Sequence, residues 1–276
     1  MSVAVLRPGV EPSREAAALP DHLAVADLRL VYETSRGPLT ALDGLSFGLA
    51  KGEFVSVLGP SGCGKSTLLK LVTGLLRPTA GRISLAGAPV AGPRPDVGIV
   101  FQQPTLLPWR TVLDNVLVPI RARGQPVASH RDRALALIDL VGLSAFARHY
   151  PHELSGGMQQ RVGLARALVL DPEVLFFDEP FSALDAMTRE TMSDELQRIW
   201  MTAGKSVLFI THSIPEAVYL SDRIIVMGPR PGRVIDAVTV DVPRPRTLET
   251  MAAPRFNEIS TYLRGVFRNL PGPARP

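Results

Sequence analysis

The sequence predicts an α/β fold, and three observations indicate it. Short apolar runs bounded by turn residues recur along the chain and have the length of buried strands. Stretches with apolar residues at helical spacing lie between these runs. A glycine-rich segment, residues 59–67, joins one such strand to one such helix. Strand, glycine-rich turn and helix in this order predict an α/β core with an anion-binding loop.

Composition sets limits on class and compartment. The 276 residues are 46% hydrophobic and 20% charged, which is typical of one large or two ordinary globular domains. Cys63 is the single cysteine, so no intramolecular disulfide can form, and a small residue filling a tight loop is the simplest interpretation of it. We find neither a signal peptide nor an apolar run long enough to span a bilayer, and we expect a cytoplasmic protein.

The formal net charge of +4 permits an anionic partner without choosing one. Nucleic acid, anionic ligands and an anionic membrane surface would all fit this charge. The arginines are scattered, however, and no basic run is interleaved with aromatic residues. We therefore expect no nucleic-acid partner.

The segment from Gly59 to Thr67 has the spacing G-x-x-x-x-G-K-[S/T] between an apolar run, 54–58, and a helix beginning at Lys65. Its backbone N–H groups and the helix dipole point at one place, where a polyphosphate is stabilised. We expect Lys65 to reach the β- and γ-phosphates and the Ser66 hydroxyl to coordinate Mg²⁺. The alternative is a turn that binds nothing, and the complete spacing argues against it. The predicted loop consists of Gly59, Pro60, Ser61, Gly62, Cys63, Gly64, Lys65, Ser66 and Thr67.

The chain before the loop predicts a disordered extension and then a hairpin. Residues 1–21 are rich in Ala, Pro and charge without an apolar period. Residues 23–32 and 39–49 alternate apolar and polar side chains, as the half-buried strands of an antiparallel hairpin do. Tyr32 lies near the end of the first strand, where it either stacks on an adenine ring or is an ordinary strand aromatic.

After the loop the pattern predicts one helix and two short strands. Leu68, Val72, Leu75 and Leu76 fall on one helical face, which Gly74 and Pro78 end. Residues 81–85 and 97–101 are strand candidates. The second ends in a polar break that contains Gln102.

Residues from about 103 to 165 predict a helical insertion in the α/β core. Residues 112–120 and 131–141 have helical periodicity, and the second has a stripe formed by Ala134, Leu137, Ile138 and Val141. A further helix opens at Leu154-Ser-Gly-Gly-Met-Gln-Gln-Arg161, with Ser155 as its N-cap. The Ser155-Gly156-Gly157 turn is either an anion site or merely a flexible cap.

Two adjacent carboxylates follow the next buried strand. Residues 174–177 form a continuous apolar run that delivers Asp178 and Glu179 to its end. Ligands in α/β sheets bind outside the carboxyl ends of the strands, so we expect Asp178 to hold Mg²⁺ through water and Glu179 to address an attacking water. A solvated acidic turn is the alternative, but Pro180 and Phe181 follow without a polar run.

The last strands bring one histidine to the same edge of the sheet. A helix should run from Ser182-Ala-Leu-Asp185 to about residue 200, and the strand 207–210 ends at Thr211-His212. A lone histidine after a strand is more often structural, but its arrival beside the loop and the carboxylates favours a functional role. Residues 224–227 and 234–240 should finish the sheet. We expect the core to end near residue 242 and a short tail, 243–276, to contain one helix over 256–267.

With these motifs in this order, the chain resembles the ATPase subunits of ABC transporters over residues 22–242. A phosphate loop alone occurs in many NTPases. The Ser-Gly-Gly-Met-Gln-Gln-Arg run one helix before the Asp178-Glu179 strand is much more specific. The resemblance implies a P-loop NTPase (RecA-like) core with an antiparallel β subdomain and a helical insertion subdomain.

The resemblance also implies roles for single residues. Tyr32 would stack on adenine, and Gly59 to Thr67 would be the Walker A loop. Gln102 would contact Mg²⁺ and the attacking water, and Asp178 would be the Walker B aspartate. Glu179 would be the general base, with His212 touching the γ-phosphate.

Other residues would act across a dimer of ATPase subunits. Ser155, Gly156 and Gly157 would close on the γ-phosphate bound to the second copy, and Asp185 would lie in a loop that crosses the interface. The further partners implied are membrane permease subunits and, indirectly, a solute-binding protein. The implied location is the cytoplasmic face of the cell membrane, with ATP and Mg²⁺ as ligands.

Within the family, residues 101–116 and 227–234 look most like importer subunits of the nitrate, sulfonate and taurine group. Importers of pyrimidine-type thiamine precursors share these features. The short tail argues against maltose-type subunits, which carry a long C-terminal domain. We also expect Leu106, Leu107, Trp109 and Val112 to dock a short helix of a membrane subunit. The alternative is that these residues form a small core of the insertion, which fits Leu106 and Val112 equally well, whereas we expect Trp109 to be partly exposed.

Two other function classes compete with an importer ATPase. A soluble ABC protein of repair or translation usually has two cassettes or a long coiled-coil insertion, and the sequence has neither. A small-molecule kinase would need neither the Ser155-Gly156-Gly157 helix nor His212.

Overall fold

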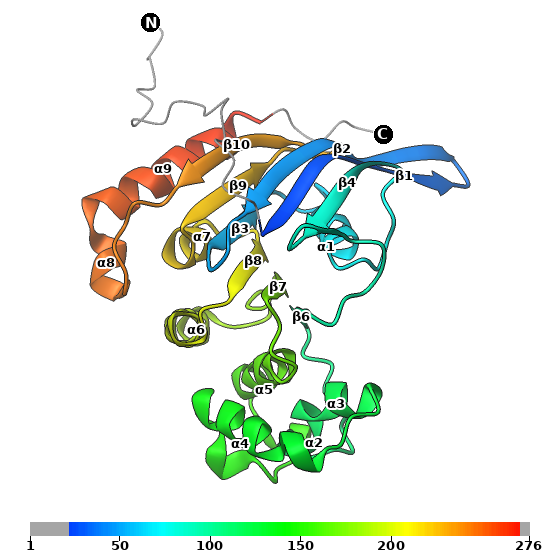
Figure 1. Cartoon of the computed structure of the whole chain (residues 1–276). Helices are drawn as coiled ribbons and strands as arrows, with labels where there is room; N and C mark the ends of the chain where they lie inside the picture. The colour runs from blue at the N-terminus through cyan, green and yellow to red at the C-terminus, as the bar shows by residue number, and fades with distance from the viewer. Residues whose placement is uncertain (1–21, 271–276) are drawn as a thin grey trace, which may run out of the picture.

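The computed structural model describes residues 22–270, so the predicted disordered extension, 1–21, lies outside the described residues. This part of the chain contains two sheets with helices packed beside them and a separate group of helices (Figure 1). None of the helices in residues 22–270 is long and apolar enough to cross a membrane.

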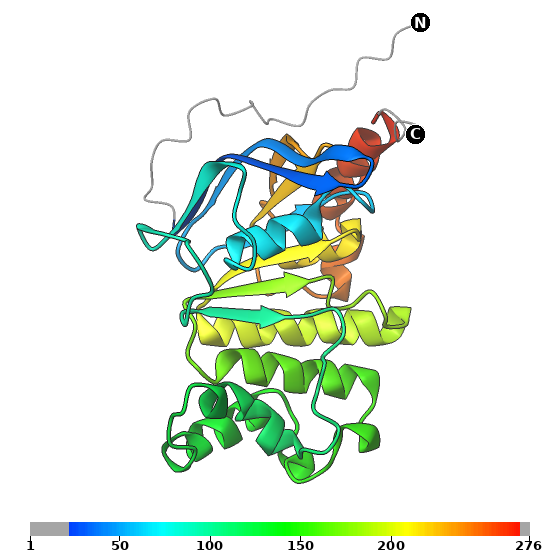
Figure 2. The ribbon, with the colours of Figure 1, turned by 90° about the vertical axis from the view of Figure 1, so that its right-hand side faces the viewer.

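The larger sheet is mostly parallel and has the order β10-β9-β3-β8-β7-β6. β3 pairs in parallel with β8 and β9, and β7 with β6 and β8, whereas β10 is antiparallel to β9. Parallel strands end at one edge, as their aligned arrowheads show (Figure 2). The bounds are β3 Phe54–Leu58, β6 Val97–Val100, β7 Val174–Asp178, β8 Ser206–Thr211, β9 Arg223–Met227 and β10 Val234–Thr239.

Both faces of this sheet are covered, which explains its continuous apolar runs. On β7, Phe177 packs into one buried cluster and its neighbour Phe176 into the other. On β8, Phe209 packs into the same cluster as Phe177, and Leu208 packs into the same cluster as Phe176. Successive side chains of a strand point to opposite faces, so a strand buried on both sides must be apolar at every position.

The smaller sheet is antiparallel, with the order β2-β1-β4-β5. The predicted hairpin is confirmed, because β1 pairs antiparallel with β2 from Leu23↔Leu49 to Thr34↔Gly37. The strands are β1 Leu23–Thr34, β2 Gly37–Leu49, β4 Ala80–Leu85 and β5 Ala88–Pro89.

The helix after the phosphate loop, α1 (Lys65–Val72), is shorter than the apolar pattern predicts. Gly74 has φ +74 and follows directly after the C-cap, so the chain turns away before Leu75. Leu75 is therefore 54% exposed, and placing it on the buried face with Leu68 and Val72 was wrong.

The helical insertion contains α2 (Val112–Val116), α3 (Val118–Ala122), α4 (Arg131–Leu140) and α5 (Gly156–Leu168). The single helix expected over 112–120 is thus two short helices. Ala134, Ile138 and Val141 of the predicted stripe are buried, and Leu137 is partly buried against the same cluster. Of these helices, α2, α3 and α4 lie at the end of the molecule opposite the antiparallel sheet (Figure 1).

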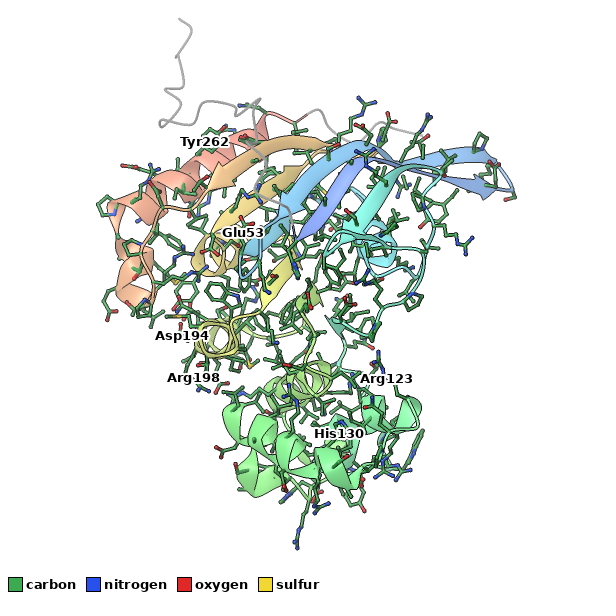
Figure 3. The ribbon with its side chains drawn as sticks, in the orientation of Figure 1. Glu53, Arg123, His130, Asp194, Arg198 and Tyr262 are labelled. Atoms are coloured by element: carbon green, nitrogen blue, oxygen red, sulfur yellow. The ribbon has the colours of Figure 1, made fainter. Side chains whose placement is uncertain are left out.

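The insertion is tied to the core by side chains that reach backbone groups. Arg198 of α6 (Ala186–Ala203) donates to the Leu140 carbonyl at 2.7 Å (Figure 3). Arg133 of α4 donates to the Val169 carbonyl at 3.0 Å.

The C-terminal segment extends the core past residue 242, contrary to expectation. In α9 (Pro254–Arg268), Phe256, Ile259 and Leu263 are buried in the same cluster as the sheet and α7 (Ile214–Leu220). Arg246 is 2% exposed and donates to the carbonyls of Val218, Tyr219 and Ser221 at the end of α7. Burial lowers the pKa of Arg246 to about 10. The Pro- and Arg-rich composition predicted an exposed tail, because arginine charges are usually solvated by water. Here backbone carbonyls take the place of water around Arg246. A short helix, α8 (Leu248–Ala252), precedes α9.

Candidate functional site

The loop between β3 and α1 leaves the N-terminus of the helix open to a ligand. Gly64 is the N-cap, with φ +105 and no side-chain cap. A Cβ at this position would lie 2.7 Å from Leu42 Cδ2, so only glycine fits. The first-turn N–H groups of a helix have no partner within the helix and, together with its dipole, favour an anion.

Lys65 reaches across this loop from the first turn of α1. Its Nζ donates to the Gly59 and Pro60 carbonyls at 2.8 and 3.1 Å. The same nitrogen lies 3.3 Å from Glu179 Oε1. Lys65 is only 5% exposed, and a buried ammonium group is stable here because oxygen atoms surround it.

Glu179 and His212 come from neighbouring strands of the large sheet. Glu179 follows β7 and His212 follows β8, and Asp178 pairs with Ile210 across them. His212 Nδ1 lies 2.8 Å from Glu179 Oε2, so the carboxylate bridges the histidine and Lys65. Glu179 adopts the left-handed backbone conformation, φ +44, and its N–H donates to the Ile210 carbonyl at 2.9 Å.

Asp178 lies at the last position of β7, beside this network. Burial, and then the neighbouring Glu179 charge, raise the pKa of Asp178 above its usual range. Two carboxylates in sequence at a sheet edge are stabilised by a cation, which fits the predicted binding of a divalent metal. The Ser66 hydroxyl and the Asp178 carboxylate are oxygen donors of the kind Mg²⁺ prefers.

One pocket brings most of the predicted loop residues together with Glu179. It also contains Arg230, which the sequence analysis did not identify. β9 is the parallel neighbour of β3, so the segment after β9 reaches the edge where the phosphate loop lies. Arg230 was not identified from the sequence because the order of the strands in the sheet was not predicted. The lining residues are Ser61, Gly62, Gly64, Lys65, Ser66, Thr67, Glu179 and Arg230.

Tyr32 contacts the same loop from β1. Its hydroxyl lies 3.3 Å from Thr67 Oγ1, and its ring is partly buried against the small-sheet side of the core. The structure therefore brings Tyr32 next to the loop. Stacking on adenine stays a prediction.

The remaining predicted residues do not line this pocket. Gln102 is exposed, as are Ser155 and Asp185. Ser155 is the N-cap of α5 and accepts from the Met158 N–H at 3.3 Å. Asp185 caps α6, and hydrogen bonds from Thr188 lower the pKa of its carboxyl.

Gly156 and Gly157 are the first two residues of α5, directly after the Ser155 cap. A Cβ on Gly157 would lie 3.3 Å from Thr188 Cγ2, so the α5 turn and the α6 turn are neighbours. Gly156 is exposed together with Ser155, whereas Gly157 is buried, and neither glycine lines the Lys65 pocket.

Phosphate loop, buried lysine, carboxylate and histidine meet at one edge of a parallel sheet, an arrangement that defines a nucleoside-triphosphatase of the P-loop class. The profile of the family described as ABC transporter matches residues 42–182. The chain belongs to this family, and it is an ATPase of the ABC type.

Close relatives support the assignment over most of the chain. A taurine import ATP-binding protein of Burkholderia pseudomallei is 47% identical over 246 residues, 87% of this chain and 95% of the relative. An uncharacterized ABC transporter ATP-binding protein of Methanocaldococcus jannaschii is 49% identical over 224 residues, 81% of this chain and 84% of the relative.

Solved structures share the fold. An ATP-binding cassette solved as a dimer in a post-hydrolysis state with ADP and Pi has a TM-score of 0.68 and 33% identity, and the match covers 79% of this chain and 98% of that one. A Clostridium perfringens cassette from an ABC transporter complex has a TM-score of 0.73 and 28% identity, with 90% and 98% covered.

Proposed function

We propose that the chain is the subunit that binds and hydrolyses ATP to energise an importer of taurine, nitrate, a sulfonate or a related small solute. The observation behind the hydrolytic part is the contact of Glu179 with both Lys65 and His212. Support for the import part comes from the taurine import ATP-binding proteins that are 46–47% identical to this chain.

In this proposal Lys65 and the loop N–H groups bind the β- and γ-phosphates. Glu179 orients the attacking water and accepts its proton, and His212 keeps the carboxylate in place. Phosphoryl transfer has a loose transition state, so positioning and charge stabilisation supply most of the catalysis. Mg²⁺, when held by Ser66, Asp178 and Gln102, would neutralise charge on the phosphates.

A second copy of the chain completes the proposed site. Ser155 and Gly156 are exposed and lie outside the Lys65 pocket, so they are free to contact phosphate bound to another subunit. Asp185 lies beside them and would cross the same interface. The solved cassette with ADP and Pi is itself a dimer. ATP would thus close the two copies, and hydrolysis would release them.

A permease subunit would dock on the insertion beside Gln102. Trp109 is 69% exposed, as expected for a docking residue, and the loop carrying it is fixed by Asn115, whose amide donates to the Leu107 and Arg110 carbonyls. Val112 is fully buried in the core, so of the two alternatives for this residue the core position is correct and it does not belong to the docking surface. Phe101, 40% exposed, lines a groove between β6 and the insertion that extends the surface.

The proposed location is the cytoplasmic face of the cell membrane, with the chain held there by its permease. A solute-binding protein would then act only indirectly on ATP hydrolysis. The decisive measurement is ATPase activity of the complex assembled with its permease across a panel of anions delivered by the binding protein. Stimulation by taurine or another anion of this group supports the proposal, and equal rates with and without every anion contradict it.

The docking surface has a separate test. Trp109→Ala should leave the isolated chain folded and able to bind ATP, while co-purification with the permease falls. Leu75→Ala is the matched control, since Leu75 is exposed on another segment. Unfolding of the isolated Trp109→Ala chain, or unchanged assembly, would contradict this surface.

A further inference from the structure

Helix α5 holds the segment after β6 by its backbone. Gln160 Nε2 donates to the Gln102 carbonyl at 2.7 Å. One turn and a half further along, Arg166 donates to the carbonyls of Pro104 and Thr105 at 2.5 and 3.1 Å. The path of the Gln102 segment is therefore set by side chains of α5.

The same Gln160 amide nitrogen also reaches the segment after β7. It donates to the Pro180 carbonyl at 2.8 Å, and Pro180 directly follows Glu179. A single amide group thus bridges the chain beyond β6 and the chain beyond β7. Gln160 is 5% exposed, so this bridge is inside the protein.

The two hydrogen bonds of the Gln160 amide differ in their exposure to water. Gln102 is exposed, so water can reach a carbonyl there, whereas Pro180 is buried and its carbonyl depends on the Gln160 amide. Within residues 22–270 nothing donates a hydrogen bond to Gln160 Oε1, although this atom is buried. Burying an unsatisfied oxygen is unfavourable, so this penalty partly offsets the stability that the Pro180 hydrogen bond contributes.

We infer that Gln160 is a positioning residue for ATP hydrolysis. It fixes the positions of the Gln102 and Glu179 segments relative to each other and to α5. Ser155 and Gly156 at the start of the same helix are only about 7.5 Å of helical rise away. The part of the inference that concerns Ser155 and Gly156 rests on the two-copy site proposed above. Movement of α5 on closure would thereby move both catalytic segments with it.

The first test is Gln160→Met, which keeps the side-chain length and removes both donors. We expect unchanged ATP affinity, a lower melting temperature because the buried Pro180 carbonyl loses its donor, and a kcat reduced roughly 10- to 100-fold, the size of loss that small misplacements of catalytic groups cause. Gln197→Met is the matched control. Gln197 is also a buried glutamine, 4% exposed, but its amide donates to the Arg246 carbonyl, so this variant should lose stability with little change in kcat.

A second variant separates positioning from packing through its pH profile. In Gln160→Glu a carboxylate would face two carbonyl oxygens and donate to neither. Burial raises the pKa of such a carboxyl, and the protonated form regains one donor. Its kcat relative to the parent should therefore recover as the pH falls, while the ratio for Gln160→Met stays flat.

Two results would overturn the inference. One is a Gln160→Met kcat within about twofold of the parent, since a factor of two is far below the effect expected for misplaced groups. The other is an equal fall in kcat for Gln160→Met and Gln197→Met. Failure of the two-copy site is distinguishable, because Glu179→Gln alone would then form no dimer with ATP, whatever residue stands at position 160.

Discussion

The N-termini of α1 and α5 are alike in sequence and differ in what surrounds them. Glycines lie at both, since Gly62 and Gly64 precede α1 and Gly156 and Gly157 begin α5, and a helix dipole favours an anion at each. At α1 the buried Lys65 contacts Glu179, which contacts His212. At α5 the Ser155 hydroxyl accepts from the helix itself, and no lysine lies in the first turn. The two helix ends therefore differ in the charged groups around them, and the function proposed above gives them different tasks: α1 would bind phosphate within one chain, and α5 would donate to a phosphate held by a second copy.

Glu179→Gln should have the largest effect and tests the chemical half of this comparison. The amide keeps the shape at α1 but cannot accept a proton, so turnover should fall roughly 10²- to 10⁴-fold. ATP binding should stay nearly intact, and the variant should accumulate as an ATP-bound dimer. Rate measurements with size analysis would show both. Near-normal hydrolysis would assign the base elsewhere.

Lys65→Ala tests whether α1 binds phosphate through its lysine. A hydrogen bond to a charged group contributes about 1.5–3 kcal/mol, so ATP affinity should fall roughly 10- to 100-fold. Turnover should fall too. Nucleotide titration measures the change, and unchanged affinity with unchanged turnover would remove the central claim about this loop.

Gly156→Ala probes the α5 end without disturbing the fold. A Cβ there meets only Leu184 Cδ2, at 3.8 Å, and alanine favours a helix over glycine. We expect a monomer at least as stable, unchanged ATP affinity, and dimer turnover reduced roughly 10-fold because the methyl group displaces the facing phosphate. Equal kcat in parent and variant would mean that α5 contacts no phosphate.

Arg230→Gln should have the smallest effect. Arg230 is exposed at the pocket that Lys65 lines, and exposed charge pairs contribute about 0.2–1 kcal/mol. ATP affinity should weaken by no more than about fivefold, with the loss shrinking at high salt. A larger loss that salt leaves unchanged would show that Arg230 becomes buried on ATP binding.

The sequence predicted the site residues that lie in one continuous motif or directly after buried parallel strands. The loop and Lys65 form one continuous motif, and Glu179 and His212 end neighbouring buried strands, so their meeting follows from the general rule for parallel sheets. The antiparallel hairpin followed from alternation alone.

What the sequence did not predict depends on tertiary partners. Arg230 reaches the pocket only because β9 pairs with β3, and the order of strands is not written in any short segment. Arg246 looked like a tail residue, since three of its carbonyl partners, at the end of α7 and just after it, lie far from it in sequence. The role of Gln160 could not be predicted, because nothing in the sequence distinguishes it from the polar residues beside it. The fold places the Gln102 and Pro180 carbonyls within hydrogen-bonding distance of its amide.

The backbone conformation at Glu179 is unfavourable for a glutamate, so this residue lowers the stability of the fold. Its φ of +44 is a conformation that glycine, asparagine and aspartate adopt more readily than glutamate does. A chain evolving for heat resistance alone would gain up to about 1 kcal/mol by placing glycine in such a position, apart from the charges lost. With Glu179 as the proposed general base, a substitution that stabilises the backbone here would abolish turnover. Of two such variants, Glu179→Asn should have a higher melting temperature than Glu179→Gln.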